Sequence, residues 1–138
     1  MDRIIVGVDF SPSSEQAARE AASLAADTGA ELHLVTASRK SGTQVVRGGG
    51  EAWTISDVDR AREQLRALAG TLGSDITVKC AVLDGDAAKA LVAEAERIGA
   101  DAIVVGNKRV SGVSRVLGAV ALEVVRHAPC GVYIAKTT

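Results

Sequence analysis

The stretch that decides the fold is Arg3-Ile4-Ile5-Val6-Gly7-Val8-Asp9, close to the N-terminus. Its apolar residues follow one another without the polar alternation of a strand that faces water on one side. Such a run is typical of the central strand of a parallel sheet, which other elements cover on both faces. The sequence therefore predicts an inner strand over these residues.

Helix and strand signals alternate along the rest of the chain. Ser11 is a suitable N-cap, Pro12 suits the first helical position, and Gly29 ends the alanine-rich segment that begins at Ser13. Further strands are expected at 31–37, 75–83, 101–105 and 131–136, and further helices at 54–72, at 87–98 and from 113 or 114 to 127. This alternation predicts a doubly wound α/β fold, with a mostly parallel five-stranded sheet and helices on both faces.

Length and composition favour a single domain. The chain has 138 residues, of which 47% are hydrophobic, and this is enough for one core. We expect one domain over residues 1–138. Residues 38–53 hold Gly42 and the glycine triplet 48–50 with little apolar periodicity, so a long mobile loop is expected there.

Charge and aromatic content argue against nucleic acid or membrane as a partner. The net charge is −1, which gives no general attraction to polyanions. Phe10, Trp53 and Tyr133 are the only aromatic residues of the sequence, too few for a base-stacking groove. No apolar stretch reaches the roughly 18 residues of a membrane span, and no signal peptide is evident. We expect a cytoplasmic protein.

A second informative stretch follows the fourth expected strand. Residues 106–120 read Gly-Asn-Lys-Arg-Val-Ser-Gly-Val-Ser-Arg-Val-Leu-Gly-Ala-Val, with three glycines, three cations and no acid. Glycines let a backbone approach a ligand closely, and the first N–H groups of a helix attract anions. The end of the first strand, with Gly7 and Asp9, is the other candidate binding position. Periodicity alone leaves open whether these two strands are neighbours.

Asp9 has two interpretations that the sequence leaves open. A carboxylate at the end of a buried strand is costly unless it is solvated or paired. Asp9 either contacts a ribose hydroxyl, a purine edge or a metal, or it accepts backbone N–H bonds from the turn at 11–14.

Catalytic motifs are absent from the sequence. It contains neither GxxxxGK[ST] nor GxGxxG. His33 lies in an expected strand and His127 at a helix end, and no serine or cysteine is placed beside either by spacing. Cys80 and Cys130 lie in apolar surroundings without metal-ligand spacing, so reduced thiols are expected. We predict a protein without a metal site that is not an enzyme. Slow ATP hydrolysis, the weakest hypothesis, would require Asp9 with a metal.

Three motifs together resemble the universal stress protein (UspA-like) family. They are Val-Gly-Val-Asp-Phe-Ser-Pro-Ser at 6–13, Val-Val-Gly-Asn-Lys at 104–108 and Arg-His-Ala-Pro-Cys-Gly-Val-Tyr-Ile-Ala at 126–135. The resemblance covers residues 3–136. It implies a Rossmann-like fold of the adenine-nucleotide α-hydrolase type, with a five-stranded parallel sheet in the order 3-2-1-4-5. That order would make the first and fourth strands neighbours.

The resemblance also implies a nucleotide site. Some family members bind ATP or AMP through a glycine, two residues, a second glycine, nine residues, and a glycine followed by serine or threonine. Here Gly106 matches the first glycine, Arg109 stands at the second, eight residues lead to Gly118, and Ala119 takes the hydroxyl position. The implied nucleotide or anion contacts are Gly7, Asp9, Leu34, Val105, Gly106, Lys108, Arg109, Arg115, Gly118, Ala119 and Val120.

These departures from the family motif predict weak or altered binding of ATP or AMP. Arg109 lacks the freedom of glycine at positive φ, and Ala119 lacks a hydroxyl donor worth on the order of 1 kcal/mol. Lys108, Arg109 and Arg115 supply positive charge in exchange. Two alternatives remain: a ligand-free dimeric interaction module whose cleft Arg109 closes, and an ordinary ATP-binding member of the family.

The last strand is expected at an edge of the sheet, where its backbone groups lack a partner. The resemblance implies that a homodimer covers this edge through Val132, Tyr133, Ile134 and Ala135. The alternative is a short edge that Lys136 protects. A further protein partner, unidentified by the sequence, would fit a stress-response role.

Overall fold

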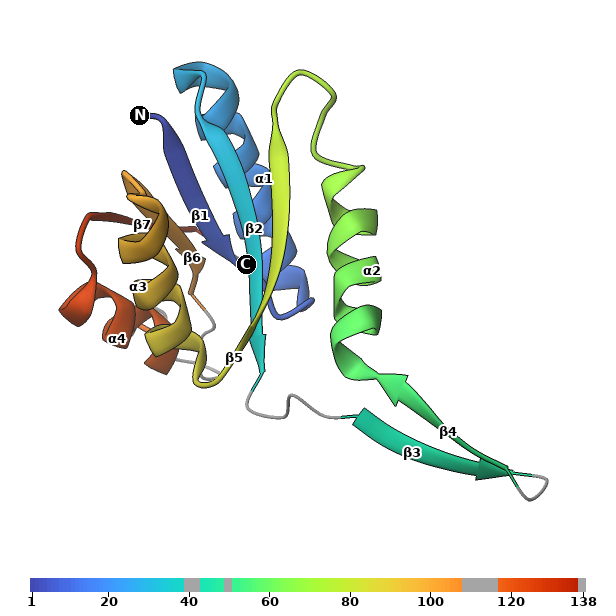
Figure 1. The fold of residues 1–138 in the computed structure, drawn as a ribbon. Helices are drawn as coiled ribbons and strands as arrows, with labels where there is room; N and C mark the ends of the chain where they lie inside the picture. Colours follow the sequence, from blue (N-terminus) through green and yellow to red (C-terminus); the bar gives the residue numbers. More distant parts are fainter. Residues whose placement is uncertain (39–42, 49–50, 108–116, 137–138) are drawn as a thin grey trace.

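The computed structural model describes residues 1–38, 43–48, 51–107 and 117–136 of the chain. Its main sheet has five parallel strands in the order β5-β2-β1-β6-β7 (Figure 1). The strands are β1 (Arg3–Gly7), β2 (Glu31–Ser38), β5 (Val78–Asp84), β6 (Ala102–Gly106) and β7 (Gly131–Ala135). Counted among the parallel strands alone, this is the order 3-2-1-4-5. The predicted Rossmann-like α/β fold is confirmed, and the first and fourth of these strands are neighbours.

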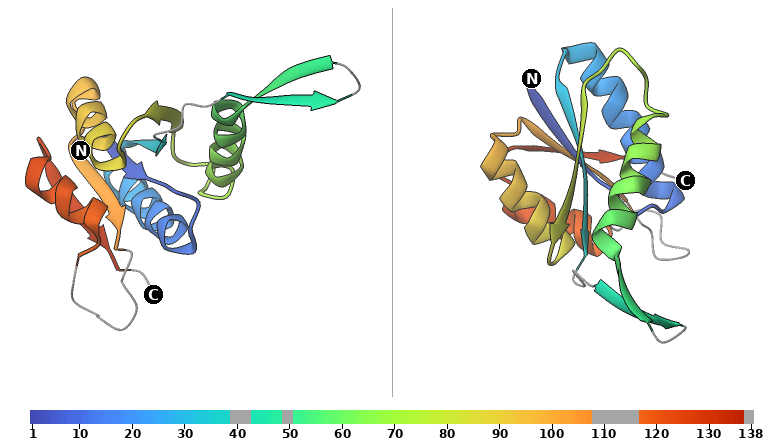
Figure 2. Two further views of the ribbon diagram at one scale, coloured as in Figure 1. Left: turned by 90° about the horizontal axis from the view of Figure 1, so that it is seen from below. Right: turned by 45° about the vertical axis from the view of Figure 1, so that its right-hand side comes forward.

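Four helices cover the two faces of this sheet. The helices α1 (Pro12–Thr28) and α2 (Asp57–Ala69) pack on one face, and α3 (Ala87–Ile98) and α4 (Ala119–His127) pack on the other (Figures 1 and 2). None of the helices that the structure describes is long and apolar enough to cross a membrane.

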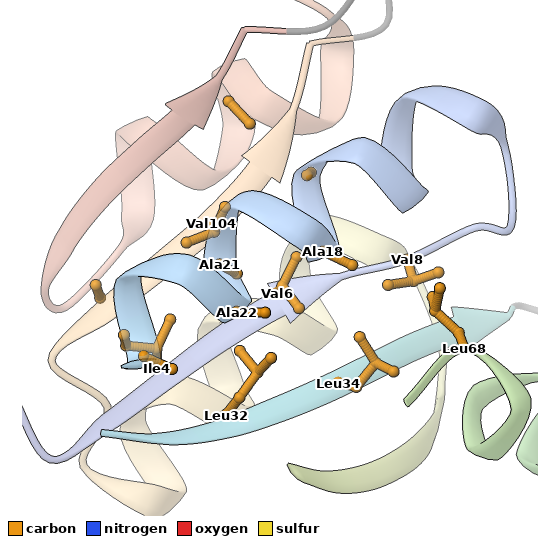
Figure 3. Close-up of a cluster of buried hydrophobic side chains, with 14 of the residues drawn as sticks. Ile4, Val6, Val8, Ala18, Ala21, Ala22, Leu32, Leu34, Leu68 and Val104 are labelled. Atoms are coloured by element: carbon orange, nitrogen blue, oxygen red, sulfur yellow. The ribbon is translucent and has the colours of Figure 1, made fainter. Parts of the chain in front are cut away.

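Alternate residues of β1 supply both halves of the core. Ile4 and Val6 point toward α1, together with Val8 just after the strand (Figure 3). Ile5 belongs to the cluster on the other face, with residues of α3 and α4. Ile4, Ile5 and Val6 are each 0% exposed, and full burial of such side chains contributes roughly 1.5–3 kcal/mol each. The unbroken apolar run at the N-terminus therefore reflects a strand with no solvent-facing side.

The first helix has the ends that the sequence predicted. The Ser14 N–H donates to Ser11 Oγ at 3.2 Å, and Gly29 ends the helix in the left-handed conformation at φ 74°. Its buried face is mostly alanine, so the helix axis lies close to the sheet. The buried alanines are Ala17, Ala18, Ala21, Ala22 and Ala25.

The prediction of an irregular loop at 38–53 is wrong for the described residues. The strands β3 (Thr43–Gly48) and β4 (Glu51–Ser56) pair in antiparallel fashion, from Thr43 opposite Ser56 to Gly48 opposite Glu51. Figures 1 and 2 show this hairpin extending from the start of α2, away from the main sheet. A hairpin forms through backbone hydrogen bonds between two short strands and needs no long apolar period. Because the glycines and the weak periodicity of this segment favour a loop, the sequence did not indicate the two strands. Residues 39–42 and 49–50 lie outside the described residues.

The helices α2 and α4 both start later than predicted, and α2 also ends earlier, at Ala69 rather than at residue 72. Because β4 runs to Ser56, α2 begins at Asp57 rather than at residue 54. The helix α4 begins at Ala119, because Gly118 has an extended backbone with φ −61° and ψ 161° and forms its N-cap. Of the residues between the predicted start and Gly118, 113–116 lie outside the described residues, and Leu117 is not helical.

The Asp101 side chain holds the N-terminal end of β1 through two hydrogen bonds. Its Oδ2 accepts the backbone N–H of Asp2 at 2.6 Å and that of Arg3 at 3.1 Å. These two bonds stabilise the ionised carboxylate and hold the pKa of Asp101 below its ordinary value. The carboxylate therefore contributes stability that is complete above the unfolded pKa, about 3.9, and is lost as the pH falls through the lower folded pKa.

Asp101→Asn tests this attachment of the N-terminus. The variant should be less stable than the wild type at neutral pH, because it keeps an acceptor oxygen but loses the charge. The difference in free energy of unfolding should shrink as the pH falls below about 4, where the wild-type carboxyl is protonated. Urea unfolding at a series of pH values measures it. A stability difference that does not change with pH would contradict this account.

Candidate functional site

A cleft of about 280 Å³ opens at the carboxyl ends of the central strands. The chain leaves β1 for a helix on one face and leaves β6 for a helix on the other, and such a reversal between neighbouring strands opens a crevice. The described residues that line the cleft are Gly7, Val8, Asp9, Ser11, Ser13, Ser14, Val35, Ala37, Ala87, Leu91, Val105, Gly106, Gly118, Ala119, Val120 and Ala121.

Most of the site residues expected from sequence meet in this cleft. Those placed in its lining are Gly7, Asp9, Val105, Gly106, Gly118, Ala119 and Val120. Lys108, Arg109 and Arg115 lie outside the described residues. The two strand ends that the sequence could not connect thus form one site.

The expected position of Leu34 in the cleft wall is wrong. Leu34 is fully buried among the side chains beneath α1 and α2, near Val8 and Leu68 (Figure 3). Its neighbour Val35 faces α3 and lines the cleft, together with Ala37. Successive strand residues point to opposite faces, so an error of one position moves a side chain across the sheet. The pairing of Val35 with Gly7 gives the correct register.

Asp9 takes part in the turn that starts α1. The Ser11 N–H donates to Asp9 Oδ1 at 3.0 Å, and the Asp9 N–H donates to Ser14 Oγ at 3.2 Å. This confirms that Asp9 accepts a backbone N–H from the turn. Asp9 is also exposed and lines the cleft, so its side chain is accessible to a ligand as well.

The residue after Asp9 has an unusual backbone. Phe10 has φ 65°, in a region that bulky residues rarely occupy. Its side chain packs against the core beneath α1 and α2, and this burial offsets the backbone strain. The sharp turn at Phe10 is what brings Ser11, Ser13 and Ser14 to the rim of the cleft.

Gly7 and Gly106 serve close packing in this structure. Neither is among the described glycines with positive φ. A Cβ on Gly7 would lie 2.8 Å from Leu91 Cδ1, and a Cβ on Gly106 would lie 3.1 Å from the Ser13 carbonyl oxygen. The glycines therefore allow α3 and the start of α1 to approach the strands, which shapes the cleft from two sides.

Three helix N-termini meet at the cleft. The starts of α1, α3 and α4 all contribute lining residues, and helix N-termini carry partial positive charge, which favours anions. Among the described lining residues, Asp9 is the single one with a charged side chain. In this part of the cleft, backbone N–H groups and serine hydroxyls are thus the donors that face a ligand.

Sequence reasoning did not find all of the functional positions. Ser13, Ser14, Ala87 and Leu91 line the cleft but are not among the predicted site residues, although Ser13 ends the first family motif. The first two follow directly from the N-cap at Ser11, which was a usable signal. Leu91 lies in the middle of a helix, and its position follows from helix packing alone.

Metal and thiol chemistry receive no support from the described part of the chain. No group of three or more His, Cys, Asp or Glu side chains there is arranged to hold a metal ion. Cys80 and Cys130 are free, and burial raises the pKa of both thiols, which keeps them protonated.

The sequence matches the model of the universal stress protein family over residues 1–136. The chain belongs to the universal stress protein family. The family resemblance of the sequence motifs is thereby confirmed. No curated protein matches the sequence.

Solved structures of other family members share the fold. A universal stress protein in complex with cAMP is 27% identical, with a TM-score of 0.75 over 99% of this chain and 98% of that chain. The Archaeoglobus fulgidus universal stress protein in complex with dAMP is 22% identical, with a TM-score of 0.68 over 97% of each chain. A family member from Arabidopsis thaliana with AMP bound is 18% identical, with a TM-score of 0.65 over 100% of this chain and 93% of that chain. The last two likenesses show the fold alone.

Gly106→Ala tests the close packing at the cleft. The added Cβ would press on the backbone at Ser13, and we expect a loss of about 1–3 kcal/mol in the free energy of unfolding. Gly131→Ala is the matched control, because its Cβ would lie 3.8 Å from the nearest such atom, the Asp101 carbonyl oxygen. The control should be neutral or slightly stabilising. Denaturant unfolding of both variants checks this, and equal stabilities would contradict it.

Proposed function

We propose that this family member is a non-catalytic stress-response protein whose cleft binds an adenine nucleotide with one phosphate group, and binds ATP no more tightly. The observation that carries the proposal is the cleft in which the N-termini of α1 and α4 meet at the ends of β1 and β6. The 27% identical relative is a complex with cAMP, which supports a nucleotide as the ligand.

The end of the cleft beneath α3 suits the base. Val35, Ala37 and Leu91 supply apolar surface there, and apolar walls with a few polar groups are typical of small-molecule sites. Asp9 lies in the same lining with an exposed carboxylate, which is a suitable acceptor for ribose hydroxyls or for the purine amino group. We assign the base and ribose to this end.

The start of α4 suits the phosphate. Gly118 and the first residues of the helix, Ala119 and Val120, line the cleft, and N–H groups at a helix start bind phosphate oxygens. The volume of about 280 Å³ lies just below the usual range for ligand sites, about 300–1,000 Å³, and favours a small nucleotide. The described lining offers no lysine or arginine to a longer phosphate chain.

Hydrolysis is not part of the proposal. A hydrolase would need a base or nucleophile placed on an attacking water or on the phosphate. The one titratable side chain in the described lining is Asp9, which accepts the Ser11 N–H in the turn that starts α1. The ligand is accordingly bound and released unchanged.

Calorimetric titration with adenosine, AMP, cAMP and ATP tests the function. We expect saturable binding of AMP and cAMP, weaker binding of adenosine, and no gain in affinity from AMP to ATP. ATP incubated with the protein should release no phosphate. Absence of both heat and thermal shift with millimolar AMP and cAMP would rule the proposal out, and markedly tighter binding of ATP would favour an ordinary ATP-binding member.

The same titration, carried out on two matched variants, tests where in the cleft the phosphate binds. Ala119→Ser restores a hydroxyl donor at the first residue of α4 and should tighten AMP binding about tenfold. Ala87→Ser makes the same change at the first residue of α3, at the base end of the cleft. It should leave the affinity ratio of AMP to adenosine unchanged.

We also propose that the protein is a homodimer through β7. Among the described residues, this strand pairs only with β6 and forms an edge of the main sheet. Of the residues assigned to the interface, Val132 and Ile134 pack inward and Ala135 is buried, whereas Tyr133 is 47% exposed. The contact would therefore rest on backbone groups and on Tyr133. Light scattering at micromolar concentration should give a dimer mass, and a monomer mass would contradict the proposal.

A further inference from the structure

Asn107 connects the end of β6 to the start of α4. It directly follows Gly106, and its side-chain Oδ1 accepts the backbone N–H of Gly118 at 2.7 Å, across eleven positions of sequence. The bond is partly buried. It joins the two described ends of the segment in which the sequence has Lys108, Arg109 and Arg115.

The Asn107 side chain accepts a hydrogen bond at the start of α4, which the N-cap residue of this helix cannot do. The N-cap is Gly118, which has no side chain to bond the first turn. The first intrahelical bond runs from the Leu122 N–H to the Gly118 carbonyl oxygen at 2.9 Å, so the four N–H groups before Leu122 need other partners. The Asn107 side chain accepts the first of these N–H groups, that of Gly118, and holds the helix start next to the end of β6.

The same bond decides which N–H groups face a ligand. With the Gly118 N–H directed to Asn107, the groups next along the helix belong to Ala119 and Val120, and both residues line the cleft. Asn107 is not itself among the lining residues. It acts on a ligand through the helix start, as a positioning residue.

The choice of an amide at this position is informative. Aspartate and asparagine accept N–H groups at helix starts about equally well, and a helix N-terminus favours the negative charge of aspartate. Either residue can therefore accept the Gly118 N–H. The two differ toward a phosphate at the neighbouring N–H groups, because a carboxylate would repel it and the neutral amide does not.

We propose that Asn107 is a positioning residue that orients the start of α4 for a phosphate group without adding negative charge beside it. The inference rests on the proposed function and names the device by which the site selects an anionic ligand over a neutral nucleoside.

Asn107→Asp tests it with AMP and adenosine as the two probes. The variant keeps an acceptor for the Gly118 N–H, and its melting temperature, measured alongside, shows that it is folded. Its affinity for AMP should fall about tenfold or more through repulsion, and its affinity for adenosine should stay the same. Gln64→Glu, an exposed position on α2 outside the cleft, makes the same charge change and should alter neither affinity.

Asn107→Ala removes the acceptor instead of adding a charge. It should lower the melting temperature and weaken AMP binding more than adenosine binding, because the helix start loses its orientation. Tighter AMP binding by this variant would mean that Asn107 competes with phosphate, and would overturn the inference. If the wild type binds no nucleotide, the proposed function and this inference are both wrong. If the wild type binds AMP and Asn107→Asp binds it equally well, the inference alone is wrong.

Discussion

Burial of β1 on both faces is the constraint on which the rest of the structure depends. A strand with Ile4 and Val6 on one side and Ile5 on the other needs helices over both sides, and also a hydrogen-bonded neighbour at each edge. The chain meets these needs by going to β2 on one side and by returning later as β6 on the other. The chain therefore passes to one face of the sheet after β1 and to the other face after β6, and the cleft forms between these two connections.

The cleft is the product of close packing as much as of polar chemistry. Leu91 approaches Gly7, and the backbone at Ser13 approaches Gly106, so closely that a Cβ on either glycine would require its neighbour to shift. The glycines that the sequence predicted as ligand contacts thus bring two helices against the sheet. Helix starts placed in this way present N–H groups to the cleft, and the Asn107 side chain holds one of those starts in place. Binding and folding use the same residues here.

Local signals explain how much of this could be predicted. The caps at Ser11 and Gly29 and the run at the N-terminus depend on nearest neighbours, and the structure has them as expected. The prediction for Leu34 is wrong because it rests on sequence position alone, whereas successive residues of a strand point to opposite faces of the sheet. The start of α4 was set too early because an extended Gly118, held by a residue eleven positions away, leaves no trace in periodicity. The hairpin of β3 and β4 was missed because its glycines outweighed a weak pairing signal.

The sequence by itself determined the alternation of strands and helices, the burial of the central strand and the family to which the chain belongs. Each of these follows from the order and spacing of residue types, which act over a few positions. Only the tertiary structure decided that Val35 rather than Leu34 faces the cleft, that Asp9 serves both the turn and the cleft, and that Asn107 holds the start of α4. These facts depend on contacts between segments far apart in the chain, and such contacts exist only once the sheet register and the helix packing are fixed.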